Sequence, residues 1–234
     1  MTPTWFLLNS GPSEPAANMA LDEALLEFAA RIGVPVFRIY SWTEPAATFG
    51  YFQRYAEVSS WTNLRPLIRR PTGGGLVPHD ADWTYSLIFP PGHPWHALKA
   101  TESYRRVHEW ICRALGRIGV TAELSSCDSK TKLGQCFAGA EKFDVVRNQA
   151  KIAGAAQRRN RFGLLIQGSV QGQEFAGARE LWAGGMLRKA PSSEPVHWKI
   201  LTTGITLELD QEITCRAEQL TLEKYSQASY NERR

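Results

Sequence analysis

The chain has 234 residues, of which 43% are hydrophobic and 21% charged, a composition typical of a folded globular protein that excludes a disordered one. Its formal net charge of +4 is mildly basic, but no block of five or six consecutive Lys and Arg residues points to nucleic acid. No stretch approaches the roughly 18 apolar residues of a membrane-spanning helix, and the N-terminus lacks a signal-peptide pattern. We therefore expect a cytoplasmic protein with neither a nucleic-acid nor a membrane partner.

The first half of the chain predicts short strands and two helices. Apolar residues recur at helical spacing in two segments, and runs rich in β-branched and aromatic residues predict the strands. The expected order is a strand at 5–8, a helix opening at 13–15, strands at 34–42 and 47–52, a segment at 67–70 leading into a glycine turn, a strand at 83–89 and a helix at 101–118.

The second half begins with strands and ends with helices. The expected order is a polar loop at 125–134, strands at 143–146, 150–155 and 164–170 joined by turns at 147–149 and 158–161, a helix at 173–183, a terminal helix at 213–225 and a frayed end at 231–234. Strands dominate the centre and helices flank it. The predicted class is therefore α+β, with a central mixed, mostly antiparallel sheet flanked by helices.

The most informative segment, 69–80, places three consecutive glycines between two arginines and a His-Asp pair. Because glycine has no Cβ, Gly73, Gly74 and Gly75 can adopt positive φ and let a ligand approach the backbone N–H groups. Arg70 adds a permanent positive charge beside this turn. A hairpin turn with a solvated basic flank is the alternative interpretation of the same residues.

His79 and Asp80 follow the glycines and could form an acid–base pair. We expect His79 instead to fix the turn or line a pocket, because no serine or cysteine adjoins it. Two arginine clusters provide either a solvated face or a surface for an acidic partner: Arg65, Arg69 and Arg70, and Arg158, Arg159 and Arg161.

Lys151 follows a predicted turn and precedes the small residues 153–156, which leave space above the strand. Lysine is rarely buried unless it is paired, so a solvent-facing turn residue is one interpretation. The other is a cation aimed at an acyl carbonyl or phosphate oxygen. A second reactive group, Cys136, lies in a glycine-flanked loop ahead of this lysine.

The chain has four cysteines, and none forms a Cys-x-x-Cys motif, so no zinc or redox motif is predicted. A nearby cation favours the nucleophilic thiolate, which makes Cys136 a candidate nucleophile and Cys127 its main competitor. The alternative for Cys136 is a small buried hydrophobe, which is the favoured interpretation for Cys112 and Cys215.

Taken in order, these segments resemble the superfamily of lipoate/biotin protein ligases and octanoyltransferases. Residues 69–86 match its acyl-binding glycine motif, and 151–157 match its lysine motif. Further matches are 18–23 to its first helix, 38–42 and 47–53 to its first strands, and 167–169 to the strand facing the lysine motif. The resemblance covers roughly residues 5 to 175 and implies a single catalytic domain over 1–234, with its core at about 5–210 and a tail at 211–234.

The resemblance also indicates the branch. Cysteine-dependent transferases of this superfamily place Cys-Phe ahead of the lysine hairpin, where this chain has Cys136 and Phe137. Another transferase branch carries its cysteine after the lysine motif, where this chain has Ser169 and no cysteine. The closest match is thus the cysteine-dependent octanoyltransferase branch.

For that branch the resemblance implies catalysis by Cys136 and Lys151. It also implies these substrate-binding residues: Arg70, Thr72, Gly73, Gly74, Gly75, His79, Gly154, Gln157, Gln167 and Gly168. The expected reaction moves an octanoyl or lipoyl group from acyl carrier protein to a lysine of a lipoyl-domain or glycine-cleavage carrier protein, without cofactor or metal. The alternatives are a lipoate–protein ligase, which would need ATP and Mg, and a non-catalytic acyl- or carrier-binding protein.

Overall fold

The computed structural model describes residues 2–126, 134, 136–172, 186, 196–201 and 207–233. The main sheet contains eight strands: β1 (Thr4–Ser13), β2 (Val36–Trp42), β6 (Trp83–Phe89), β7 (Glu123–Leu124), β8 (Val145–Arg147), β9 (Ala150–Asn160), β10 (Gly163–Val170) and β11 (His197–Leu201). A smaller sheet contains β3 (Ala46–Phe49), β4 (Leu67–Arg69) and β5 (Val77–His79). The helices are α1 (Pro15–Glu27), α2 (Ala29–Ile32), α3 (Tyr55–Val58), α4 (Pro94–Ala97), α5 (Ala100–Gly116), α7 (Leu207–Leu220), the π-helical turn η2 (Thr221–Tyr225) and α8 (Ala228–Asn231).

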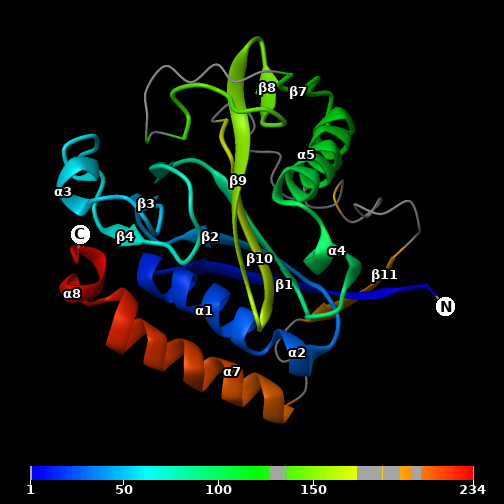
Figure 1. Cartoon of the computed structure of the whole chain (residues 1–234), viewed down its shortest axis with the longest axis vertical. Helices are drawn as coiled ribbons and strands as arrows, with labels where there is room; N and C mark the ends of the chain where they lie inside the picture. The colour runs from blue at the N-terminus through cyan, green and yellow to red at the C-terminus, as the bar shows by residue number, and fades with distance from the viewer. Residues whose placement is uncertain are drawn as a thin grey trace.

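The main sheet has the strand order β11-β1-β2-β6-β10-β9-β8-β7. The β11–β1 and β1–β2 pairings are parallel, and the other pairings are antiparallel. Helices α1 and α7 lie side by side along one face, and α4 and α5 lie on the other side (Figure 1). This arrangement confirms the predicted α+β class with a mixed, mostly antiparallel sheet.

Two apolar cores hold the layers together, one on each face of the sheet. Strand β6 supplies both, because successive side chains point to opposite faces and every one of its residues is buried. Tyr85, Leu87 and Phe89 pack toward α5, where Trp110 is fully buried, whereas Ile88 packs toward α1. The complete burial of this strand follows from its central position.

Most predicted elements are confirmed, with shifted ends. Strand β3 stops at Phe49, because the chain turns at Gly50 and the N–H of Tyr51 donates to the carbonyl of Thr72 at 2.9 Å. Strand β9 continues to Asn160, so the second hairpin turn is shorter than expected. Strand β11 was not predicted. Most of the predicted loop at 125–134 and the whole predicted helix at 173–183 lie outside the described residues.

The prediction of a frayed C-terminal end is wrong for Asn231. Its side-chain Oδ1 accepts the backbone N–H of Arg69 at 2.8 Å, and its carbonyl accepts the Arg69 guanidinium at 2.9 Å. The same guanidinium donates to the carbonyls of Tyr51 and Gln53 at 2.8 and 2.7 Å. A buried cation needs such acceptors, so Arg69 fixes both the C-terminal turn and the segment after β3.

A buried ion pair joins α1 to the sheet. The guanidinium of Arg38 on β2 donates to the Asp22 carboxylate at 2.7 Å, and both side chains have no exposed surface. Three more donors reach this carboxylate: Tyr40 at 3.0 Å, Ser86 at 2.7 Å and Gln167 at 2.8 Å. Four hydrogen bonds compensate the desolvated charge, so Asp22 fixes α1 against β2, β6 and β10.

We predict that Asp22→Asn lowers the free energy of unfolding by about 3–5 kcal/mol, because it leaves the Arg38 charge buried without its counter-ion. Chemical denaturation measures this loss. Glu212→Gln is the control, since it removes a carboxylate from an exposed pair with Arg31 and should leave the midpoint near the wild-type value. Equal midpoints for the two variants would refute the structural role of Asp22.

Candidate active site

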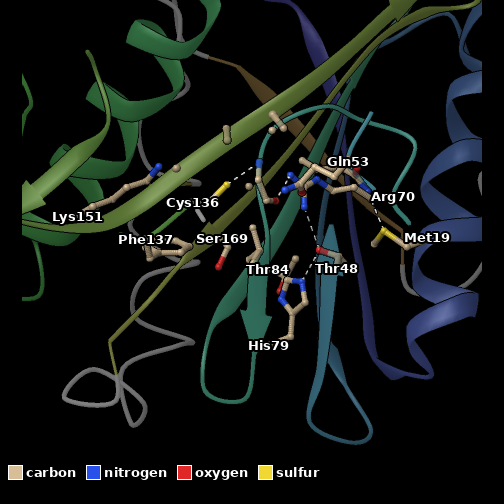
Figure 2. Close-up of a pocket in the computed structure, with 18 of the residues that line it drawn as sticks. Met19, Thr48, Gln53, Arg70, His79, Thr84, Cys136, Phe137, Lys151 and Ser169 are labelled. Carbon is tan, nitrogen blue, oxygen red and sulfur yellow. Dashed lines mark hydrogen bonds between the residues drawn. The ribbon is translucent and has the colours of Figure 1, made fainter. Parts of the chain in front are cut away.

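A cavity of about 270 Å³ lies where the two sheets meet, close to the lower end of the size range of small-ligand pockets. In Figure 2, Cys136, Phe137 and Lys151 lie toward one side of this cavity, and Met19 lies toward the other. Its lining also includes residues of β2, β3, β5, β6, β9 and β10. The site is therefore assembled from segments that are distant in the sequence.

A row of cross-strand neighbours forms the floor of the cavity. Tyr40 pairs with Thr84, Thr84 with Ser169, and Ser169 with Gly154, and all four residues line the cavity. The row crosses β2, β6, β10 and β9 and therefore extends over three strand spacings, about 14 Å in total. The floor thus reaches from the lysine end of the cavity to the aromatic residues of β2.

The hydroxyl groups of Ser169 and Thr84 in this floor are bound to one carboxylate. Asp82 Oδ2 accepts from Ser169 at 2.6 Å and from Thr84 at 3.0 Å, and it lies 2.8 Å from His79 Nδ1. The carboxylate partner of His79 is therefore Asp82 and not Asp80, which is exposed in the turn between β5 and β6.

His79 is held from two further sides. Its Nε2 lies 2.8 Å from the hydroxyl of Thr48, and the ring of Trp42 stacks on it with centroids 4.0 Å apart. Histidine 79 lines the cavity and fixes the turn, which are the two roles expected from the sequence.

The glycine turn is wrapped around Arg70. The guanidinium donates to the carbonyl of Gly73 at 2.6 Å and to that of Gly75 at 2.7 Å, while Gly74 has φ of 85°. Gly50 leaves room for this turn, since a Cβ there would lie 1.9 Å from the carbonyl oxygen of Gly74. The turn therefore requires glycine for its backbone angle and for close approach.

Arg69 and Arg70 are buried, so they form neither of the two surfaces that the sequence offered for the first arginine cluster, a solvated face or a face for an acidic partner. Their charges are directed to backbone carbonyls. Of the predicted clusters, the exposed or partly exposed members are Arg65, Arg158, Arg159 and Arg161.

Cys136 lies next to the glycine turn. The backbone N–H of Gly75 donates to its sulfur at 3.1 Å, and the N–H of Cys136 donates to the carbonyl of Leu76 at 3.1 Å. Burial lowers the pKa of the Arg70 guanidinium, and its charge and hydrogen-bond interactions with Cys136 oppose that shift. A backbone donor and a buried cation thus lie beside the Cys136 sulfur.

The other described cysteines lack this environment. Cys112 packs against the core under α5, where burial raises the pKa of its thiol to about 11. Cys215 is exposed on α7 and does not line the cavity. Cys127 lies outside the described residues. Among the cysteines in the described part of the chain, Cys136 alone lines the cavity.

Lys151 lines the same end of the cavity, and its side chain is 5% exposed. Its ammonium lies 2.7 Å from the Asp144 carboxylate and faces the ring of Phe137 at 5.3 Å. The register of β8 and β9 passes from Val145 opposite Ala153 to Val146 opposite Lys151, so β9 contains one extra residue there. This bulge brings Lys151 to the side of Gly154, whereas a regular strand would separate them.

Most of the predicted site residues come together at this cavity. Those that line it are Arg70, Gly74, Gly75, His79, Cys136, Lys151, Gly154, Gln167 and Gly168. Thr72, Gly73 and Gln157 are not among its described lining residues. Thr72 donates instead to Gln167 at 2.7 Å, and its predicted role in binding substrate stays a prediction.

Sequence reasoning missed the carboxylates behind the site, Asp22, Asp82 and Asp144. A signal was available for Asp22, which sits among the apolar positions of the first helix. Within the described residues, no group of three or more His, Cys, Asp and Glu side chains is arranged to hold a metal. The described helices also include none with the length and apolar character needed to cross a membrane.

Comparison with known proteins places these features in a family. Residues 14–171 match the model of the lipoyl protein ligase A/B catalytic domain. An octanoyltransferase (LipM) of Staphylococcus aureus is 35% identical over 183 residues, which cover 73% of this chain and 66% of that protein. The corresponding protein of Bacillus subtilis is 33% identical over 180 residues, covering 71% and 65%. The chain thus spans just under two thirds of the length of these relatives.

Two solved structures share the fold. Lipoate-protein ligase A bound with ATP superimposes with a TM-score of 0.71 at 20% identity, covering 99% of both chains. The bipartite lipoate protein ligase of Thermoplasma acidophilum has a TM-score of 0.67 at 18% identity, covering 99% of this chain and 96% of that one.

We predict that Gly75→Ala disturbs the Cys136 segment, because the added Cβ would lie 2.4 Å from the carbonyl oxygen of Gly134 and 3.1 Å from the nitrogen of Cys136. The rate of Cys136 alkylation by iodoacetamide, followed by peptide mass spectrometry, should change severalfold. Gly73→Ala is the matched control, since its Cβ would meet no atom within 4 Å. The same rate in both variants would contradict this packing.

Proposed function

The chain belongs to the lipoyl protein ligase A/B catalytic domain family, and we propose that it is an octanoyltransferase that forms a thioester on Cys136. The donor is octanoyl-acyl carrier protein, and the acceptor is a lysine of a lipoyl-domain or glycine-cleavage carrier protein. A lipoyl group could take the place of octanoyl in the same cavity. The observation that carries the proposal is the position of Cys136, at one end of an acyl-sized cavity beside a backbone donor and a buried guanidinium.

The floor of the cavity suits an alkyl chain. An extended eight-carbon chain spans roughly 9 Å, given carbon–carbon bonds of about 1.5 Å in staggered geometry. The row from Gly154 to Tyr40 is long enough for it, and the hydroxyl hydrogens of Ser169 and Thr84 are directed to Asp82. Those side chains therefore need no hydrogen bond from the substrate.

In the first half-reaction, the Cys136 thiolate attacks the thioester carbonyl of the donor. A new carbon–sulfur bond forms to Cys136, the bond to the carrier's sulfur breaks, and that thiolate takes a proton as it leaves. The Lys151 ammonium at the same end of the cavity supplies positive charge for the carbonyl oxygen or the leaving sulfur.

In the second half-reaction, the neutral ε-amine of the acceptor lysine attacks the Cys136 thioester. A carbon–nitrogen bond forms, the amine loses a proton, and the Cys136 sulfur departs as thiolate. The two half-reactions need neither nucleotide nor metal. We accordingly propose a cofactor-free enzyme of the cytoplasm, where both carrier proteins would meet it.

The main competing function is an ATP-dependent lipoate–protein ligase, since ligases share the fold. Such an enzyme would activate free lipoate as an adenylate with ATP and Mg, and it would not need the thiol of Cys136. A non-catalytic acyl- or carrier-binding protein would bind the carrier and modify nothing.

We predict that incubation with octanoyl-acyl carrier protein adds one octanoyl group to the protein, as seen by intact mass spectrometry. Cys136→Ser should abolish the acid-stable, hydroxylamine-sensitive thioester, because it removes the attacking sulfur. Lys151→Ala should slow transfer to the acceptor lysine on the order of a hundredfold, since it removes a charge aimed at the reacting oxygen.

Cys127→Ser is the matched control and should keep the adduct. Loss of the adduct in Cys127→Ser alone would identify Cys127 as the nucleophile. Turnover of free lipoate with ATP that persists in Cys136→Ser would establish the ligase instead, and carrier binding without any adduct would favour the non-catalytic protein.

A further inference from the structure

We propose that Asp144 is the positioning residue that holds Lys151 at the Cys136 end of the cavity. The proposal rests on the proposed function only for the reaction that Lys151 serves. The contact itself is direct: the Lys151 ammonium lies 2.7 Å from Asp144 Oδ2, and both side chains are more than nine-tenths buried. The ion pair restricts the Lys151 side chain to one conformation. The lysine is therefore already immobilised before the substrate binds.

Hydrogen bonds within the turn that contains Asp144 fix the position of its carboxylate. The backbone N–H of Glu141 donates to Asp144 Oδ2 at 2.7 Å, and the N–H of Asp144 donates to the carbonyl of Glu141 at 2.9 Å. Ser125 pairs with the turn twice: its N–H donates to the carbonyl of Asp144, and its carbonyl accepts the N–H of Phe143, both at 2.8 Å. The carboxylate is therefore held through its own oxygen and through its backbone.

Phe143, the residue before Asp144, has a strained backbone. Its φ of 73° lies in the left-handed region, which a bulky side chain rarely adopts. His108 on α5 supports it, because Nδ1 of this buried histidine lies 2.6 Å from the carbonyl of Phe143. Strain of this kind persists only where the surroundings over-determine it, and it is typical of functional sites.

Gly154 leaves the space that the pair occupies. A Cβ at this position would lie 2.6 Å from Lys151 Cε, 2.8 Å from its Nζ and 3.3 Å from Asp144 Oδ1. Gly154 is not among the glycines with positive φ, so alanine can adopt its backbone. The atoms it would displace are the end of a flexible side chain. Gly154→Ala should therefore fold and push the lysine away from its carboxylate.

The bulge in β9, the open position at Gly154 and the strained turn at Phe143 all serve one contact. Without Asp144, the four-carbon stem of Lys151 would be free to sample other rotamers. A displacement of about 1 Å at a reacting group is enough to cost a hundredfold in rate. Asp144 itself does not line the cavity, so its effect on the reaction acts through Lys151.

The test compares Asp144→Asn, Asp144→Glu and Gly154→Ala with the wild-type full chain. The first readout needs no activity: the Nζ ammonium signal of Lys151 in a ¹⁵N-lysine NMR spectrum, assigned with Lys151→Arg. The second is octanoyl transfer, resolved into kcat and KM for the donor carrier. Glu123→Gln is the matched control, because it removes an exposed carboxylate from β7 at the same edge of the sheet.

We predict that the ammonium signal broadens or disappears in Asp144→Asn and Gly154→Ala, and that in Asp144→Asn kcat falls on the order of tenfold to a hundredfold with little change in KM. Asp144→Glu should recover part of both, and Glu123→Gln should match the wild type. An unchanged signal in Asp144→Asn and Gly154→Ala would overturn the proposal, whatever the activity. A signal that depends on Asp144 in a protein that transfers no octanoyl group would support the positioning and refute the proposed function.

Discussion

The buried carboxylate of Asp22 is the constraint on which the rest of the structure depends. It accepts hydrogen bonds from side chains of β2, β6 and β10, and so sets how α1 lies on the sheet. One of these donors, Gln167, also accepts the hydroxyl of Thr72 at 2.7 Å. Thr72 leads directly into the glycine turn, so two hydrogen bonds in series connect the helix to the turn. A shift of α1 would therefore reach the Gly75 N–H that donates to Cys136.

Buried carboxylates also separate the polar surface of the cavity from its apolar surface. Asp22 and Asp82 each gather hydroxyl, amide or imidazole groups that would otherwise face an alkyl chain. The cations that line the cavity include Arg70 and Lys151, and each has a defined partner. Arg70 is bound to the carbonyls of the glycine turn, and Lys151 is bound to Asp144. Positive charge thus lies where the acyl carbonyl would react, and the floor from Gly154 to Tyr40 extends away from that point.

The elements that depend only on short-range sequence pattern were predicted from it. The β-branched and aromatic residues of β6 and the helical spacing of α5 needed no tertiary information, and the ordered glycine and lysine motifs predicted several of the residues that meet at the cavity. Features that depend on contacts between residues far apart in the sequence were not predicted. β11 exists by pairing with β1 from the other end of the chain, and Asn231 is ordered by Arg69. Asp82 replaces Asp80 because the bend after β5 decides which carboxylate faces His79. The direction of Lys151 depends on a single extra residue in β9, which no periodicity reveals.

The measurement that tests the central claim most directly is a crystal structure of the protein after reaction with an octanoyl thioester. The account predicts continuous density from the Cys136 sulfur to a carbonyl carbon, with the alkyl chain lying over Gly154, Ser169 and Thr84 toward Tyr40. The carbonyl oxygen should face the Lys151 ammonium. Density for an acyl chain bonded to another residue, or for an unbonded acid with Cys136 unmodified, would contradict it.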